Sequence, residues 1–386
     1  LDHAIGLVAL ADADEGRIIE VETDISSNLP AFVLVGLPDA SVNEAAARVR
    51  AAATNSKLPL PGRRITVNLS PASVPKQGSS FDLAIAVSVL SASGYFPNSR
   101  IEGTVFYGEL ALDGRIKPVI GVLAAVVAAK QLGIETIVIP ASNLNEVSRV
   151  SGIQVLAFDH LTQLAHDLGV DVAVVPPKPL KQVVDKPIEI APCFSEVVGQ
   201  EDAISAMKVA AVGGHHLKMV GPPGAGKTML ATRLPSILPA LTEDQSIEVG
   251  SIRSLAKQID FQLSDIPPLQ SPHHTASLVA MVGGGSAQPR PGLISLAHRG
   301  VLFLDEAPEF QSAVLEALRQ PLESGVITIS RASGQASFPA RFQLLLAANP
   351  CPCGFAVGAG KECSCNASAR ARYLAKLSGP LSDRID

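Results

Sequence analysis

The run Gly221-Pro222-Pro223-Gly224-Ala225-Gly226-Lys227-Thr228 fits the phosphate-binding pattern G-x-x-x-x-G-K-[ST]. Its fixed positions are occupied by Gly221, Gly226, Lys227 and Thr228. Glycines let the backbone N–H groups of such a loop close around phosphate oxygens, and the N-terminus of the next helix adds a favourable dipole. Lys227 would neutralise charge on the β- and γ-phosphates, and the Thr228 hydroxyl would ligate Mg²⁺. The pattern predicts a nucleoside triphosphate site, against the alternative of a glycine-rich turn with a chance lysine.

An acidic motif follows the apolar run Val301–Leu304, which is typical of a buried strand. A carboxylate at the C-terminal end of a strand in an open α/β sheet points into the crevice where ligands bind. Asp305 would hold the magnesium ion, directly or indirectly, and Glu306 would act as the general base towards the attacking water. Such a motif is common when it stands alone, but together with Gly221–Thr228 it predicts nucleotide hydrolysis.

Two further polar residues could complete this site. Asn349 ends the expected strand Gln343–Ala348, where its side chain could position the same water, and the alternative is a turn asparagine before Pro350. Arg384 is a candidate arginine finger, and the alternative is a solvated surface arginine. The residues alone leave both alternatives open.

Four of the five cysteines lie within fifteen residues, as Cys351-x-Cys353, nine intervening residues and Cys363-x-Cys365. Zinc takes tetrahedral ligation by four thiolates and orders short loops that lack an apolar core. We therefore predict a zinc site. Four reduced thiols are the alternative, since C-x-C is a less usual spacing than C-x-x-C, and a disulfide pair is the least favoured option.

The elements that must position these residues alternate between strands and helices. From about Ala191 onwards, the apolar runs Leu217–Val220, Val301–Leu304 and Gln343–Ala347 predict a parallel sheet covered on both faces. Met229–Leu238 is the expected helix after the phosphate-binding loop.

Residues 1–170 predict a separate mixed α/β unit. Helical spacing and many alanines predict helices at Ser41–Ser56 and Gly121–Leu132, and Asp113-Gly114 suits a hairpin turn. Short β-branched or apolar runs predict strands at Phe32–Val35, Ile65–Asn68, Val105–Leu112, Ile134–Ile139 and Gln154–Phe158. The proline-rich residues 171–190 lack periodicity and are expected to form a linker to a second domain over residues 191–386.

The composition excludes several classes of protein. Of the 386 residues, 47% are hydrophobic and 17% charged, so wholesale disorder is excluded. Aromatic residues are 4% with no Trp, which argues against base-stacking platforms, and the net charge of −5 leaves nucleic-acid contact to local basic loops. The longest apolar run, Val119–Ala129, is shorter than the ~18 residues of a membrane span. We expect a cytoplasmic protein with reduced thiols, no membrane contact and no signal peptide.

Further long motifs accompany the phosphate-binding loop, at Phe194–Gln200, Pro272–Ser277, Gly283–Gly285, Pro291–Glu306, Asn349–Gly354 and Ser378–Asp386. Through them, essentially the whole chain resembles the ComM/YifB group of magnesium-chelatase-like AAA+ ATPases. The resemblance implies a ring, usually a hexamer, that binds ATP and Mg²⁺ at subunit interfaces. It also implies a DNA translocase or helicase that drives branch migration in recombination and natural transformation. The alternatives are a chelatase-like motor that remodels a partner protein, an ATP-dependent protease and a nucleotide-switch scaffold.

The same resemblance implies roles for individual residues. Asn349 is similar to the family's sensor residue, and Arg384 to the finger that reaches the γ-phosphate of a neighbouring subunit. Val198 and Gly199 occupy positions that contact adenine in AAA+ proteins. The implied nucleotide-binding set continues through the loop to Met229.

The spacing of the motifs implies an insertion. Lys227 and Asp305 are 78 residues apart, which is long for a minimal core, and the excess is expected near residues 255–295. His273 and His274 lie within this stretch without a third metal ligand at suitable spacing, so we expect a structural or pore-loop role for them.

A second insertion, Val326–Phe338, is expected to be a hairpin that faces the pore, as in related ring motors. Arg331 and Arg341 would then contact DNA phosphates, and the alternative is that both are solvated surface arginines. Family members continue past the position of Asp386 into a helical lid with another arginine, so the lid is expected to be missing here.

Residues 1–170 resemble the Lon-protease-like α+β domain (S5-type fold). Pro75–Ser80 corresponds to the loop of the nucleophile, with Ser80 at the serine position. The position of the catalytic lysine is occupied by Leu123, which cannot accept the hydroxyl proton. We predict no peptidase activity for this domain and expect it to dock on the ring or on DNA.

Overall fold

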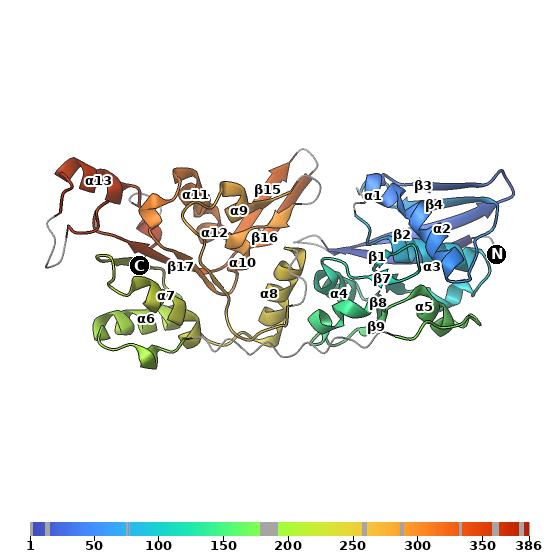
Figure 1. Cartoon of the computed structure of the whole chain (residues 1–386), viewed down its shortest axis with the longest axis horizontal. Helices are drawn as coiled ribbons and strands as arrows, with labels where there is room; N and C mark the ends of the chain where they lie inside the picture. The colour runs from blue at the N-terminus through green and yellow to red at the C-terminus, as the bar shows by residue number, and fades with distance from the viewer. Residues whose placement is uncertain are drawn as a thin grey trace. The chain divides into compact units, whose positions relative to one another are not determined.

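The protein is described by a computed structural model over residues 3–11, 16–74, 76, 78–177, 192–256, 261–285, 289–331, 334–356, 363–377 and 382–385. Its contacts divide the chain into two units (Figure 1). The first unit consists of Leu1–Val184 and Arg253–Leu263. The second unit consists of Asp185–Ile252 and Ser264–Asp386. Of the expected linker, residues 171–177 contain neither helix nor strand, and 178–190 lie outside the described residues. The grouping of 253–263 with the first unit was not expected from the sequence.

The first unit is built on a seven-stranded mixed sheet in the order β3-β4-β2-β1-β5-β8-β9. The antiparallel strands β1, β2 and β4 lie at its centre, and parallel pairs flank them. The sheet strands are β1 (His3–Ala11), β2 (Gly16–Ser26), β3 (Ala31–Val35), β4 (Arg64–Ser70), β5 (Thr104–Phe106), β8 (Thr136–Pro140) and β9 (Gln154–Phe158). The remaining elements are the β6 (Glu109–Leu110) and β7 (Ile116–Lys117) pair and helices α1 (Ala40–Asn43), α2 (Ala45–Asn55), α3 (Asp82–Ala92), α4 (Val122–Gln131) and α5 (Leu161–Asp167).

Helix α3 is the centre of this unit's core, and every one of its residues is buried. It packs against β1, β2 and α2 (Figure 1). Strand β2 alternates buried and exposed residues, because only one of its faces meets the core. The sequence analysis missed both elements of this contact, α3 and the β1–β2 pair. A helix that is apolar on all sides lacks the amphipathic stripe by which surface helices are found.

The predicted strands and helices of this unit are largely confirmed, with two differences. The expected strand Val105–Leu112 is two short strands, β5 and β6, which Tyr107 and Gly108 separate. The expected helix Ser41–Ser56 is divided into α1 and α2 at Glu44. The hairpin turn at Asp113-Gly114 lies between β6 and β7, as predicted.

The second unit contains the predicted parallel sheet, in the order β10-β17-β14-β11. Its strands are β10 (Leu217–Val220), β11 (Leu269–Gln270), β14 (Val301–Leu304) and β17 (Gln343–Ala348). Every residue of β14 and β17 is buried, so both faces of these strands are covered. On one face, Phe303 and Leu345 pack with Met207 of α6 (Glu201–Gly213) and Leu230 of α7 (Lys227–Arg233). This confirms the expected α/β architecture.

The sheet is accompanied by helices and by two small antiparallel pairs, of which Figure 1 labels β15 and β16. The helices are α6 (Glu201–Gly213), α7 (Lys227–Arg233), α8 (Glu243–Leu255), α9 (Leu278–Val282), α10 (Leu293–Leu296), α11 (Ser312–Ala317), α12 (Arg319–Ser324) and α13 (Ala367–Ala375). The pairs are β12 (Gly283–Gly284) with β13 (Arg290–Pro291), and β15 (Val326–Arg331) with β16 (Gly334–Pro339). The second pair confirms the expected hairpin.

The expected helix Met229–Leu238 is shorter than predicted. Helix α7 ends at Arg233, and a 3₁₀ turn continues over Leu234–Ile237. Pro235 has no N–H to donate back along an α-helix, which accounts for the break. Among the residues that the structure describes, no helix is both long and apolar enough to span a bilayer.

Candidate functional site

Three neighbouring strands of the parallel sheet end at the same edge. Strand β17 lies between β10 and β14 and pairs with both. Gly221 follows β10, Asn349 follows β17, and Asp305 follows β14. Because the carboxyl ends of parallel strands meet at one edge, the fold gathers three motifs that are distant in the sequence.

The phosphate-binding loop connects β10 to α7. Gly224 and Gly226 have φ values of 80° and 78°, which L side chains rarely adopt. A Cβ at Gly226 would also lie 2.8 Å from Nε2 of Gln200. The backbone conformation of the loop therefore favours glycine at positions 224 and 226.

Lys227 is held at the opening of this loop. Its Nζ donates to the carbonyl oxygens of Gly221, at 2.7 Å, and Pro222, at 3.0 Å, and to Oδ1 of Asn349, at 3.3 Å. Partial burial lowers the pKa of the Lys227 ammonium, and the nearby carboxylates of Asp305 and Glu306 oppose this shift. The loop lysine and the expected sensor asparagine are in direct contact.

Thr228 and Asp305 form the second contact between motifs. The Thr228 hydroxyl donates to Oδ2 of Asp305 at 2.6 Å, and the backbone N–H of Glu306 donates to Oδ1 at 2.9 Å. Hydroxyl and carboxylate oxygens are ligands that Mg²⁺ prefers. Their side-by-side placement fits the magnesium site that the motifs predict.

Glu306 meets a histidine that the motifs do not connect to it. Nδ1 of His274 lies 3.5 Å from Oε2 of Glu306, whose side chain is 51% exposed. The rings of His273 and His274 lie against each other with centroids 4.1 Å apart. Nδ1 of His273 lies 2.8 Å from the Thr275 hydroxyl. We expected a structural or pore-loop role for these histidines, and the approach to Glu306 was missed because no spacing rule joins the two segments.

The segment expected at adenine lies before α6. Val198 is 95% exposed, and Gly199 has a φ of 74°. The next residue, Gln200, donates from Nε2 to the carbonyl oxygen of Ala225 at 3.2 Å. Gln200 thus joins this segment to the phosphate-binding loop, a role that the sequence analysis did not identify.

Arg384 has a partner within its own chain. It lies in the 3₁₀ turn Ser382–Arg384, and its guanidinium donates to Oε1 of Glu323 on α12. A finger role requires a neighbouring subunit, so this role stays a prediction. Of the surrounding motif, Ser378–Leu381 and Asp386 lie outside the described residues.

The two arginines expected at DNA lie at different places. Arg331 ends β15, and its side chain is outside the described part of the structure. Arg341 is exposed between β16 and β17, where its backbone N–H donates to Nδ1 of His298 at 3.0 Å. Its side chain lies against Gly325, where an added Cβ would be 2.6 Å from Cγ of Arg341. Contact with DNA stays a prediction for both.

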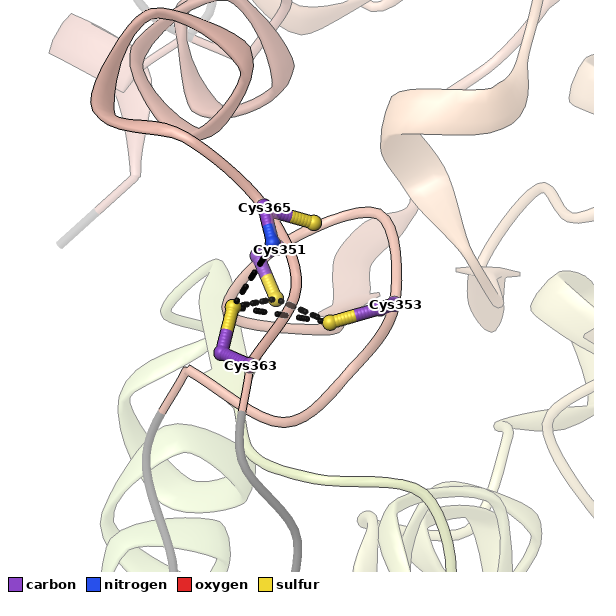
Figure 2. Close-up of side chains that lie close together, drawn as sticks. All are labelled: Cys351, Cys353, Cys363 and Cys365. Atoms are coloured by element: carbon purple, nitrogen blue, oxygen red, sulfur yellow. Dashed lines mark hydrogen bonds between the residues drawn. The ribbon is translucent and has the colours of Figure 1, made fainter.

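The four clustered cysteines converge after β17 (Figure 2). The sulfur atoms of Cys351, Cys353 and Cys363 are 3.4–3.5 Å from one another, and all four sulfurs lie within 4.8 Å of one another. Cys351 is fully buried. A hydrogen bond from the Phe355 N–H and the contact with Cys351 lower the pKa of Cys353 to about 6. The grouping fits the predicted metal ligand set.

The position of the protease nucleophile has a different environment. Ser80 is 9% exposed, and its hydroxyl is hydrogen-bonded to that of Tyr107. Leu123 is fully buried in α4. An aliphatic side chain therefore stands where the resemblance places the general base, and the predicted lack of peptidase activity depends on this difference. Pro75 and Gln77 of the loop lie outside the described residues.

Two family models match the chain. The model described as magnesium chelatase, subunit ChlI, covers residues 193–386, which include all the residues that we expect at a nucleotide. The model described as subunit ChlI of Mg-chelatase covers residues 21–143 of the first unit.

Several proteins are similar to the chain over nearly its full length. The competence protein ComM of Haemophilus influenzae is 44% identical over 381 residues, which are 96% of this chain and 73% of that protein. An uncharacterized protein YifB of Escherichia coli is 43% identical over 370 residues, 95% of this chain and 72% of that protein. A further relative is similar over a shorter stretch only: Lon protease 2 of Bacillus subtilis is 31% identical over 147 residues, which are 36% of this chain and 26% of the protease.

Proposed function

The chain belongs to the ComM/YifB group of the magnesium chelatase ChlI family of AAA+ ATPases, and on that premise we propose that it is an ATP-driven DNA translocase promoting branch migration in recombination and natural transformation. The observation that carries the proposal is the contact of Lys227 with Asn349 and of Thr228 with Asp305 at one sheet edge. It unites the loop, the acidic motif and the sensor position of an ATPase in one site.

Each side chain of the site has a separate role in the proposed hydrolysis. Lys227 binds the β- and γ-phosphates, and Asn349 orients the attacking water, whose proton passes to the carboxylate of Glu306. Thr228 and Asp305 would hold Mg²⁺, which neutralises charge that develops on the phosphates. Val198 and Gly199 contact adenine. His274 positions Glu306 through the 3.5 Å contact between the two side chains.

DNA movement requires an assembled ring, in our proposal a hexamer of this chain. Arg384 exchanges Glu323 for the γ-phosphate on a neighbouring subunit, so that hydrolysis depends on assembly. Arg331, at the tip of the β15–β16 hairpin, and the exposed Arg341 contact DNA phosphates in the pore. Such contacts position DNA without reading its sequence. The name of the ComM relative, a competence protein, supports this choice of substrate.

A second candidate is a chelatase-like motor that remodels a partner protein. Both family models carry a magnesium chelatase description, including the one over residues 21–143. The candidates differ in what stimulates ATP hydrolysis, because a translocase responds to DNA and a remodelling motor to its protein partner.

The test measures ATP hydrolysis by the full-length protein without DNA and with single-stranded, duplex and forked DNA, together with branch migration of a four-way junction. We expect DNA to stimulate hydrolysis and ATP to drive junction movement. Lys227→Ala should abolish nucleotide binding, and Glu306→Gln should retain bound ATP without hydrolysis. Hydrolysis that no DNA stimulates, with junctions left unmoved, would refute the translocase and favour the remodelling motor.

A further inference from the structure

The loop after β17 brings four sulfur atoms together from two C-x-C pairs that are nine residues apart in the sequence. Cys351 and Cys353 come directly after the strand, whereas Cys363 and Cys365 lie just before α13 (Figure 2). Three sulfurs form a triangle with sides of 3.4, 3.5 and 3.5 Å, and the fourth completes a group within 4.8 Å.

These separations match a mononuclear tetrahedral site. Four thiolates at a Zn–S distance of 2.3 Å stand about 3.8 Å apart along the edges of a tetrahedron. The observed triangle is close to that value, and the Cys365 sulfur lies within 4.8 Å of the other three. All four cysteines are unbridged thiols in this structure. A disulfide would require a pair at about 2.05 Å, and it would leave the other two sulfurs without a role.

The donor set and its surroundings select the metal. A four-coordinate site made only of sulfur is typical of closed structural zinc sites, and it excludes Mg²⁺ and Ca²⁺, which take oxygen ligands. The backbone N–H of Cys365 donates to Sγ of Cys363 at 3.4 Å. Arg370 donates from Nε to the carbonyl oxygen of Cys365 at 3.1 Å, which brings a cation to the thiolates. Both features stabilise the negative charge of a tetrathiolate site.

The cysteine loop also contacts the nucleotide site. Gly354 donates its N–H to the carbonyl oxygen of Cys351 at 2.9 Å and has a φ of 85°. A Cβ at Gly354 would lie 2.7 Å from both Cγ and Cδ of Pro223 in the phosphate-binding loop. On the other side, Asn349 precedes Cys351 by two residues and contacts Lys227. The loop therefore approaches the nucleotide site at two points.

We propose that Cys351, Cys353, Cys363 and Cys365 bind one structural zinc ion, and that this ion holds Asn349 and the Gly354–Pro223 contact in place. The proposal of a zinc site depends only on the geometry of the four sulfur atoms. Its effect on nucleotide binding rests on the proposed function of the phosphate-binding loop. The zinc takes no part in hydrolysis in this proposal, because it has no open coordination position.

The first experiment measures metal content by elemental analysis of full-length protein purified without chelators. We expect one zinc per chain, lost in the double variant Cys353→Ser/Cys363→Ser and retained in the control Cys193→Ser, which changes the lone exposed cysteine. Replacement by Co²⁺ should produce the intense visible bands and the thiolate charge-transfer band of a tetrahedral sulfur site. This second readout uses wild-type protein, so it remains informative if the double variant fails to fold.

Wild-type protein that contains no zinc and takes up neither Zn²⁺ nor Co²⁺ would overturn the site. Iron in its place would overturn the assignment of zinc. These outcomes are independent of ATP, so a failure of the translocase proposal leaves them interpretable.

The second experiment measures binding of a fluorescent ATP analogue before and after removal of zinc, with Mg²⁺ restored in both samples. We expect binding to weaken about tenfold, which corresponds to about 1.4 kcal/mol. Gly354→Ala should weaken nucleotide binding while retaining zinc, because it disturbs the Pro223 contact and not the ligands. Unchanged nucleotide affinity after zinc removal would overturn the coupling and leave the zinc site standing.

Discussion

The Thr228 hydroxyl donates a 2.6 Å hydrogen bond to Oδ2 of Asp305, although the two residues are 77 positions apart in the chain. This contact joins the end of the phosphate-binding loop to the acidic motif that follows β14. Both side chains offer oxygen ligands of the kind that Mg²⁺ prefers, so Thr228 and Asp305 would hold the magnesium ion that the proposed function requires.

Replacement of Thr228 by alanine tests this contact. If Thr228 binds Mg²⁺ as proposed, Thr228→Ala removes one ligand, and Mg²⁺-dependent hydrolysis should fall on the order of 10²-fold. The exposed position of Thr228 should spare the fold. The control is Thr232→Ala on the same helix, whose hydroxyl donates only to the carbonyl oxygen of Met229 at 3.1 Å. Equal ATPase rates for the two variants would contradict the assignment.

The ion pair between Arg384 and Glu323 leads to a prediction about subunits. If Arg384 completes the site of a neighbour, Arg384→Ala should bind nucleotide normally and lose hydrolysis. Mixing it with Lys227→Ala protein, which keeps the arginine, should restore part of the activity. Arg372→Ala, an exposed arginine on α13, is the control and should hydrolyse ATP normally. Mixtures that stay inactive would argue that the arginine acts within its own chain.

The first unit should lack peptidase activity. Ser80 contacts the Tyr107 hydroxyl, and Leu123 stands at the position of the general base. A serine-reactive probe should leave Ser80 unlabelled, and casein should remain intact in the presence of ATP. Labelling that is lost in Ser80→Ala protein would show that another group activates the hydroxyl.

The stability of the second unit should depend on Glu248 in a pH-dependent way. Its carboxylate lies 3.0 Å from Nε2 of His298 and accepts from Nε of Arg299 at 3.0 Å. The hydrogen bond with His298, together with Arg299, lowers the pKa of Glu248 from 4.5 to about 2. Because the folded state has the lower pKa, the stabilisation is present above pH 4.5 and is lost as the pH falls towards 2.

Thermal unfolding of Glu248→Gln and wild-type protein checks this dependence. After allowance for the partial exposure of Glu248, the variant should be less stable by about 1–2 kcal/mol at pH 7. The difference should shrink as the pH falls from 4.5 to 3. Glu243→Gln, at the exposed start of the same helix, should show no such trend. A constant difference at all pH values would mean that packing, rather than charge, is responsible.

The sequence by itself determined the contiguous parts of the site. The loop Gly221–Thr228, the motif after Val301–Leu304 and the cysteine spacing carry their chemistry in neighbouring residues, so local pattern was sufficient. The parallel sheet was predicted for the same reason, because strands such as β14 and β17 are continuous apolar runs. The alternation of apolar and polar residues and the length of an apolar run are properties of short segments. They can therefore be recognised without knowledge of the rest of the chain.

Only the tertiary structure decided which of these segments meet. The approach of His274 to Glu306, of Gln200 to Ala225 and of Gly354 to Pro223 each joins residues from different elements. Helix α3 escaped prediction because it is buried on every side, and its identity depends on the elements packed around it. Contacts between distant segments follow from how strands order themselves in a sheet, and the sequence pattern of one strand contains no information about its neighbour.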